Sequence, residues 1–329
     1  MTTKIPPELV DDQVFGNRNV IINGEMQISQ RDNQTGLGAN ATSYGPCDRF
    51  FSNSYATDGR FSVEQSTDTP DGFANSLKYS CTTADTSIAA GEHLVIQQKI
   101  EGLNLQKFAK GTSSAKEFAV SFYVKGNASA TYVCELYDET NNRQISKTFA
   151  VTTAWNRIEL TFPADTTGAF ANTSASAMYL AFWVHAGSTF TSGTLNSSAW
   201  AAQTAANRAV GISSFFDSTN RTLFLTGVQI ETGTQATPFE YRNIGEELAL
   251  CQRYYVELTS ARQVNPIMNA SYYTNTEIYG AIIFPTEMRT EPTIEQTTGT
   301  DYFRIYSNGV ADTFTGSVSY THLTLPTKA

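Results

Sequence analysis

The stretch Phe118-Ala-Val-Ser-Phe-Tyr-Val-Lys125 decides the fold class, because bulky apolar side chains occupy every second position along it. A period of two places alternate side chains on opposite faces of a β-strand, so this stretch predicts a strand with one buried face. The same period recurs at 157–162 and at 179–185. These segments predict that sheets, rather than helices, carry the hydrophobic core.

Further strand candidates lie between stretches rich in Gly, Asn, Thr, Ser and Asp, at 20–22, 49–55, 60–65, 77–82, 94–101, 131–137 and 223–231. About ten strands joined by turn-rich loops predict an all-β chain built on a jelly-roll β-sandwich. In the last candidate the alternation slips by one residue at Gly227, which predicts a β-bulge at that glycine.

The composition excludes several classes of partner. Only 16% of the 329 residues are charged, and the net charge is −9. No basic surplus is available to neutralise phosphates, so a nucleic-acid partner is not expected. The longest apolar runs, such as 281–284, have the length of a strand, so no membrane insertion is expected. The four cysteines lie far apart, which predicts free, mostly buried thiols rather than disulfides or a metal cluster.

The sequence divides by composition into an N-terminal arm (1–16), a jelly-roll domain (17–242), a linker helix (243–257), a small C-terminal β unit (258–317) and a tail (318–329). The helix is expected because Asn243 and Glu246 have the spacing of a capping box before an apolar face. In the C-terminal unit, Asn308-Gly309 between two apolar runs predicts a β-hairpin turn.

The tail matches something other than a natural protein. Val318-Ser-Tyr-Thr-His-Leu-Thr-Leu-Pro-Thr327 resembles the translation of a transposase-end sequencing adapter over ten consecutive positions. We therefore expect 318–329 to derive from an assembled metagenomic read set, with the natural chain truncated near Ser317.

Candidate binding residues lie on the predicted outer faces of the strands. If Leu180 and Phe182 face the core, the alternate residues of that strand face outward, and other strands and one long Ala/Ser-rich loop offer similar side chains. The candidates are Tyr179, Trp183, His185, Tyr123, Tyr137, Glu135 and Trp200. Aromatic rings can stack on the apolar faces of sugars while polar groups bond the hydroxyls. The alternative is that these aromatics pack under a loop or at an oligomer interface, and for Trp155 we favour core or rim packing.

No enzymatic activity is expected. Outside the tail the chain has two histidines, His93 and His185, on different predicted strands, and it has no nucleophile, phosphate-loop or metal-binding motif. Glycosidase carboxylates meet in space rather than in sequence, so a glycan depolymerase stays as the less favoured alternative.

Several motifs resemble marine bacteriophage tail-fibre-like structural proteins over residues 17–295. They are Asn19–Arg31 (NVIINGEMQISQR), Asp48–Phe51, Asn207–Gly211, Leu223–Gly233, Ala236–Glu240 leading into Glu246–Tyr255, Phe284–Arg289 and Glu291–Thr293. The resemblance implies a virion tail protein, a homotrimer assembled in the host cytoplasm with other tail proteins, that contacts host-surface glycan. The alternative is a purely structural tail or baseplate protein without glycan binding.

The predicted sandwich is also similar to secreted carbohydrate-binding modules, which begin with an Asn-Gly-x-Phe-Glu stretch and often carry a structural calcium ion. Here Met26 replaces the Phe, and Thr226-Gly227 occupies the place of the acidic residues before the last strand. No cofactor is expected, with one alternative: a structural calcium ion for which Glu25 is the candidate ligand.

Overall fold

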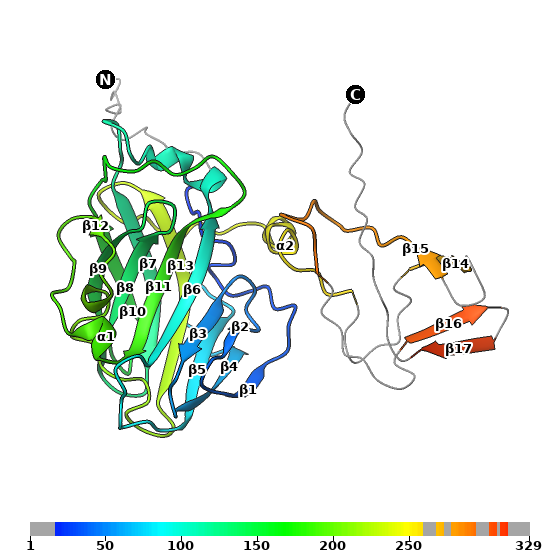
Figure 1. The fold of residues 1–329 in the computed structure, drawn as a ribbon, viewed down its shortest axis with the longest axis horizontal. Helices are drawn as coiled ribbons and strands as arrows, with labels where there is room; N and C mark the ends of the chain where they lie inside the picture. The colour runs from blue at the N-terminus through cyan, green and yellow to red at the C-terminus, as the bar shows by residue number, and fades with distance from the viewer. Residues whose placement is uncertain (1–16, 259–267, 273–277, 294–302, 308–309, 315–329) are drawn as a thin grey trace.

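The computed structural model describes residues 17–258, 268–272, 278–293, 303–307 and 310–314. These residues form two antiparallel β-sheets packed face to face, a short helix and two small strand pairs (Figure 1). The all-β fold class, a jelly-roll β-sandwich followed by a short helix and a small β unit, is confirmed.

The two sheets differ in their edges. The six-stranded sheet has the order β1 (Gln34–Leu37), β4 (Arg60–Ser66), β5 (Ser76–Thr83), β13 (Thr222–Thr232), β7 (Phe118–Gly126) and β10 (Asn156–Phe162). The seven-stranded sheet has the order β12 (Ala201–Ala202), β9 (Arg143–Val151), β8 (Ala130–Asp138), β11 (Ser176–Ala186), β6 (His93–Glu101), β3 (Phe51–Tyr55) and β2 (Thr42–Tyr44). The shorter elements are η2 (Gly102–Phe108), α1 (Ser188–Thr191) and η3 (Ala205–Asn207).

Aromatic rings from both sheets meet in the core. The alternating apolar residues of β7 are fully buried, as their period of two predicts. The ring of Phe122 lies edge-on to Phe149 and Phe182 of the other sheet, with centroids 4.9 Å apart in each case. Each such ring contributes about 1.5–3 kcal/mol on burial, so this cluster fixes the two sheets against each other.

The predicted bulge at Gly227 is confirmed. The register between β13 and β7 shifts between Thr226 and Gln229, and Gly227 has a φ of +61°. A Cβ atom there would lie 2.8 Å from the rings of Phe73 and Tyr123. Glycine therefore supplies both the left-handed backbone and the space that these rings need.

The helix predicted over 243–257 is α2 (Ile244–Gln252), which ends earlier than predicted, and it lies against the sandwich (Figure 1). Its N-cap is Asn243, whose side chain accepts a hydrogen bond from the Gly245 N–H, as the sequence predicts. Cys251 of the helix packs on Ile22 and Ile28, near the start of the described residues.

The C-terminal strands pair as two hairpin-like units, β14 (Ala270–Tyr272) with β15 (Ile278–Gly280) and β16 (Phe303–Ser307) with β17 (Val310–Phe314). The second pairing confirms the two strands of the predicted hairpin, and its turn residues Asn308-Gly309 lie outside the described residues. Residues 1–16 and 315–329, which include the arm and the adapter-like segment, lie outside the described residues. All four cysteines are free and buried, as predicted. Among the described helices, none is long and apolar enough to span a membrane.

Candidate functional site

The outer face of the seven-stranded sheet is divided into two halves. Residues 187–212, which we call the cover, cross one half and pack on Val95, Val133, Ala181 and Trp183, the covered half. The cover is tied to the sheet by backbone hydrogen bonds, such as that from the Ser146 N–H to the Asn196 carbonyl (2.8 Å). This half therefore forms a second, smaller core.

Trp183 and Glu135 lie on the predicted side of their strands, but they are buried. The Trp183 indole N–H donates to Glu135 Oε2 (2.8 Å), and the Arg208 guanidinium of the cover donates to both oxygens of the same carboxylate (2.8 and 2.7 Å). Trp183 is 2% exposed and Glu135 is 0% exposed. An open ligand-binding role for these two residues is therefore wrong, and the alternative of packing under a loop holds for Trp183.

Beside the covered half, a row of side chains crosses five neighbouring strands. It runs through Tyr44 (β2), Phe51 (β3), Lys99 (β6), Tyr179 (β11) and Tyr137 (β8), and we call it the stripe. Strand register places Tyr44 opposite Phe51, and Tyr179 opposite both Lys99 and Tyr137. The two tyrosines that the sequence analysis named are thus brought together on one face.

The members of the stripe contact one another continuously. The rings of Tyr44 and Phe51 are 5.3 Å apart, and those of Tyr137 and Tyr179 are 5.6 Å apart. Between these two pairs, Lys99 Nζ lies 5.4 Å from the Phe51 ring centre and 5.0 Å from that of Tyr179. The row therefore holds one cation between two aromatic pairs, in cation–π geometry with the inner ring of each pair.

The two tyrosine rings of the stripe are held in place by their hydroxyls. Tyr137 donates to the Asn142 side-chain oxygen (3.0 Å), and Tyr179 donates to the Glu139 carboxylate. Burial raises the pKa of both phenols, and Glu139 raises the pKa of Tyr179 further. The rings thus stay neutral and half-exposed, with fixed orientation.

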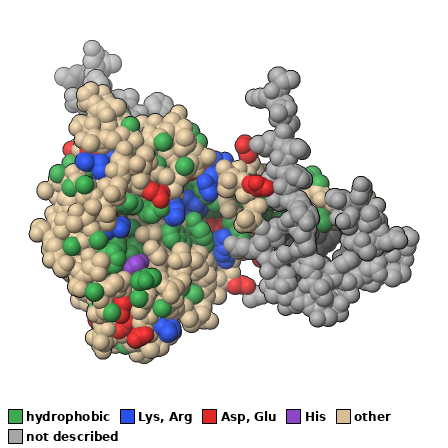
Figure 2. Space-filling model, viewed as in Figure 1, with side chains coloured by type: hydrophobic (Ala, Val, Ile, Leu, Met, Phe, Trp, Pro, Cys, Tyr) green, Lys and Arg blue, Asp and Glu red, His purple; other side chains and the backbone are tan. Residues whose placement is uncertain are grey.

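Arginines lie at both ends of the stripe. Arg208 lies over the rings of Tyr137 (5.0 Å) and Trp183 (4.8 Å), so it joins the stripe to the covered half. At the other end, Arg31 lies over Tyr44 (5.4 Å) and Tyr255 (3.4 Å). Figure 2 shows a face of the sandwich on which hydrophobic side chains lie among lysine, arginine and acidic side chains.

His185 was expected to face outward, and that prediction is wrong. A register shift between Trp183 and His185 turns the end of β11, so that His185 lies opposite Leu94 of the core. The ring is 0% exposed and packs edge-on against Phe216 at 5.0 Å. Burial lowers its pKa to about 4, so the imidazole is neutral near pH 7.

Trp200 was expected on an exposed loop, and that prediction is also wrong. The two-residue strand β12 pairs with β9 and draws the preceding residue to the end of the sandwich. There the Trp200 ring joins the main core beside Phe118 (5.6 Å), and its N–H donates to the Pro163 carbonyl (2.8 Å). Its role is therefore packing.

Tyr123 faces outward, but from the opposite sheet. It lies on β7 and packs on Phe73 (5.2 Å), which also contacts Phe239 and the exposed Tyr241. The predicted residues are therefore divided between two faces and the core, and Tyr123 cannot act with the stripe. Trp155 is half-buried at the rim, as favoured, and its N–H donates to Asp68 (3.1 Å).

The surroundings of Glu25 do not fit a calcium ion. Glu25 lies near Glu247, but the Glu247 carboxylate already binds Arg242 (3.3 Å) and the Asn23 N–H. The guanidinium thus supplies the positive charge, whereas calcium needs six to eight oxygen ligands. Burial, and then the charge of Glu247, raise the pKa of Glu25 to about 7.

Sequence reasoning missed Tyr44, Phe51, Lys99 and Arg208. A signal for Lys99 was present, because Val95, Gln97 and Lys99 alternate with core residues in the strand candidate 94–101. No signal in the neighbouring sequence indicated that the short strand β2 would pair with β3. None indicated that the cover would place Arg208 on the same sheet face.

Comparisons with known proteins give only distant likenesses. No protein-family model matches the chain, and no curated protein matches it. A family 4 carbohydrate-binding module shares 11% identity at a TM-score of 0.33, covering 64% of this chain and 98% of its own. The enzymatically active domain of bacteriophage CBA120 tailspike protein 4 shares 11% identity at a TM-score of 0.33. The match covers 66% of this chain and 22% of the tailspike chain. The family 11 carbohydrate-binding module of the Clostridium thermocellum cellulase Lic26A-Cel5E shares 11% identity at a TM-score of 0.30. The match covers 61% of this chain and 96% of that module.

Proposed function

We propose that this chain is a non-enzymatic attachment protein that binds glycan through the stripe. The observation that carries the proposal is the continuous row across the outer face of the seven-stranded sheet, in which Tyr44, Lys99, Tyr179 and Tyr137 are half-exposed around the buried Phe51 ring. In the wider context, the sequence motifs favour a bacteriophage tail fibre, acting as a homotrimer with other tail proteins in the virion and contacting a glycan on the host surface.

The chemistry of the stripe suits a sugar ligand. Pyranose rings have apolar C–H faces that stack on aromatic rings, and hydroxyls that accept hydrogen bonds from cationic donors. Tyr179 and Tyr137 supply the rings, while Lys99 supplies the donor between two aromatic groups. Because their hydroxyls are already bonded, the tyrosines lose little freedom when a ligand stacks on them.

The length of the stripe suits a chain of sugars rather than a single one. Neighbouring strands lie about 4.8 Å apart, so a row over five strands spans roughly 19 Å. A linear oligosaccharide lying across the strands would contact the half-exposed rings of Tyr137, Tyr179 and Tyr44 in turn. We therefore expect affinity to rise with oligomer length until the row is filled.

The carboxylates beside the stripe favour binding without catalysis. Glu135 is held by two hydrogen bonds from Arg208, and Glu139 accepts one from Tyr179. Neither carboxylate is free of these partners to act as the acid or the base of a carboxylate pair, which glycoside hydrolysis requires. A depolymerase would lower the viscosity of a polysaccharide solution, and we expect no such loss.

The test is glycan binding by the purified full chain and by Tyr179→Ala, first on a glycan array and then by calorimetry. We expect Tyr179→Ala to weaken binding at least about tenfold, which corresponds to about 1.4 kcal/mol. Tyr55→Ala is the matched control, because Tyr55 is an exposed tyrosine of the same sheet, stacked on His93 outside the stripe. Absence of binding to any glycan, or equal loss in both variants, would refute the proposal.

The second candidate function is a structural one, in which the stripe contacts another subunit. Tyrosine and arginine are enriched at protein interfaces, and Tyr255, which follows α2, already packs on Arg31 at one end of the stripe. Under this function, Tyr179→Ala would lower the oligomeric state measured by light scattering, and assembled particles would adsorb to cells normally.

A further inference from the structure

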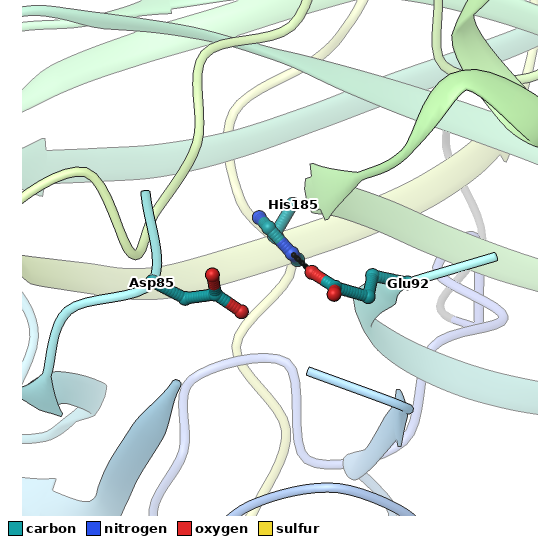
Figure 3. Close-up of side chains that lie close together, drawn as sticks. All are labelled: Asp85, Glu92 and His185. Atoms are coloured by element: carbon teal, nitrogen blue, oxygen red, sulfur yellow. Dashed lines mark hydrogen bonds and ion pairs between the residues drawn. The ribbon is translucent and has the colours of Figure 1, made fainter. Parts of the chain in front are cut away.

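Three side chains that bind metals elsewhere in proteins converge at one end of the sandwich. His185 closes β11, Glu92 immediately precedes β6, and Asp85 lies in the connection between β5 and β6. One ligand atom from each lies within 4.8 Å of the other two, and all three residues are buried. Figure 3 shows their ends turned toward one another, with His185 Nε2 3.4 Å from Glu92 Oε2.

We propose that Asp85, Glu92 and His185 bind one divalent transition-metal ion of the zinc class. Two carboxylates and one imidazole form a mixed oxygen and nitrogen donor set, which suits zinc. Calcium prefers six to eight oxygen ligands, and the imidazole makes this set a poor one for it. A water molecule completes a tetrahedral site around the three protein ligands.

The spacing is close to what such an ion requires. Bonds of about 2.0–2.2 Å in a tetrahedral site place ligand atoms about 3.4 Å apart. The His185 and Glu92 atoms already have this separation of 3.4 Å. The Asp85 carboxylate has to move inward by roughly 1 Å to complete the set.

Buried charge gives a second, independent reason for a cation. Asp85 is 5% exposed and Glu92 is 4% exposed. In the described part of the chain, neither carboxylate forms an ion pair with a lysine or an arginine. Two buried carboxylates this close are costly unless a shared proton or a cation balances their charge, and a divalent ion balances both charges at once.

Two of the three proposed ligands are oriented by a neighbour outside the cluster, as metal ligands usually are. His185 Nδ1 lies 2.8 Å from Ser214 Oγ, which leaves Nε2 directed at Glu92. Asp85 accepts hydrogen bonds from the Thr57 hydroxyl (2.8 Å) and the Asp58 N–H (2.9 Å). The backbones are fixed as well, because the Asp85 N–H donates to the Phe216 carbonyl (2.8 Å).

The ion would join two segments that are distant in sequence, and a third supplies the neighbour that orients His185. Asp85 and Glu92 belong to the loop between β5 and β6, His185 ends β11, and Ser214 follows the cover. The role derived from this placement is structural, because the ligands are buried and lie away from the stripe. Metal loading should therefore affect the stability of this end more than glycan affinity.

The test measures zinc uptake by the purified full chain after dialysis against a chelator. Zinc, manganese and calcium are added separately, and bound metal is measured by mass spectrometry after desalting and by calorimetry. We expect one zinc per chain, at least 100-fold weaker calcium binding, and a thermal midpoint that falls when chelator is added.

The variants separate this site from adventitious binding. Glu92→Gln and His185→Gln should abolish the stoichiometric zinc and the response to chelator, and Ser214→Ala should weaken zinc binding about tenfold. His93→Gln is the control, because His93 is the adjacent histidine but lies on the outer face, near Trp183 and Phe190. Glu92→Gln keeps the shape of the side chain, so it still tests zinc binding if His185→Gln does not fold.

Three outcomes would overturn the proposal. The wild-type chain could retain no more zinc than Glu92→Gln, which would indicate that a shared proton, and not a metal, balances the carboxylates. Calcium could bind as tightly as zinc, or His93→Gln could lose the metal while His185→Gln keeps it. The result does not depend on the proposed glycan binding, because the stripe is intact in every variant.

Discussion

The two halves of the outer face of the seven-stranded sheet differ in solvent exposure, although the same strands form both. Tyr179 and Trp183 lie four residues apart on β11 and point to the same side. Tyr179 is half-exposed in the stripe, whereas Trp183 is 2% exposed beneath the cover. Strand alternation decides which face a side chain joins, and a long connection elsewhere in the chain decides whether that face meets solvent.

The two halves should therefore respond differently to substitution. The covered half behaves as core, so its variants should lose stability. The stripe behaves as a binding surface, so its variants should lose affinity and keep stability. Arg208 touches both halves, and it marks the boundary at which these two behaviours meet.

The largest expected effect is on the covered half. Glu135→Ala removes the carboxylate that binds both Arg208 and Trp183, and it leaves a partly buried guanidinium unpaired. The free energy of unfolding should fall by about 3 kcal/mol or more, measured by urea denaturation. The control is Glu139→Ala, whose exposed carboxylate binds Tyr179 in the stripe and should cost less than about 1 kcal/mol. Equal losses in the two variants would remove the distinction between the halves.

A smaller effect is expected from Trp183→Phe. The ring stays apolar, but a buried hydrogen bond to a charged acceptor is lost, so stability should fall by about 2 kcal/mol. Trp155→Phe loses the same kind of bond, to Asp68, at a rim position, and should change stability by less than about 0.5 kcal/mol. Glycan affinity should be unchanged in both, and a loss in Trp183→Phe would show that the stripe extends under the cover.

The smallest expected effect is on the stripe. Lys99→Met keeps an unbranched apolar side chain between Phe51 and Tyr179 but removes the donor. Stability should change by less than about 1 kcal/mol, and glycan affinity should fall about fivefold, measured by calorimetry. Lys147→Met is the control, because Lys147 lies over Phe162 outside the stripe. An unchanged affinity in Lys99→Met would limit the binding surface to its rings.

Local sequence signals predicted local structure well. The alternation at Phe118–Lys125 corresponds to a strand, the slip at Gly227 to a bulge, and the cap at Asn243 to the start of a helix. These features depend only on residues that are neighbours in the chain, so a single sequence is enough to predict them.

The failures all came from contacts distant in sequence. The bulge before His185 contains no glycine that would have predicted it. The direction of the His185 side chain depends on the pairing of this residue with Leu94. Trp200 was misplaced because only the pairing of β12 with β9 draws it into the core. The Asp85, Glu92 and His185 cluster has no spacing motif, since it forms only where the β5–β6 loop meets the end of β11.

The edges of the seven-stranded sheet limit how copies of this chain can associate. The sheet ends in β12, with two residues, and β2, with three. Strands this short offer few backbone donors or acceptors to a neighbouring molecule, so pairing of two copies through β12 or β2 is disfavoured. At high local concentration, association of copies through the faces of the sandwich is therefore favoured over fibre-like stacking through these two edge strands.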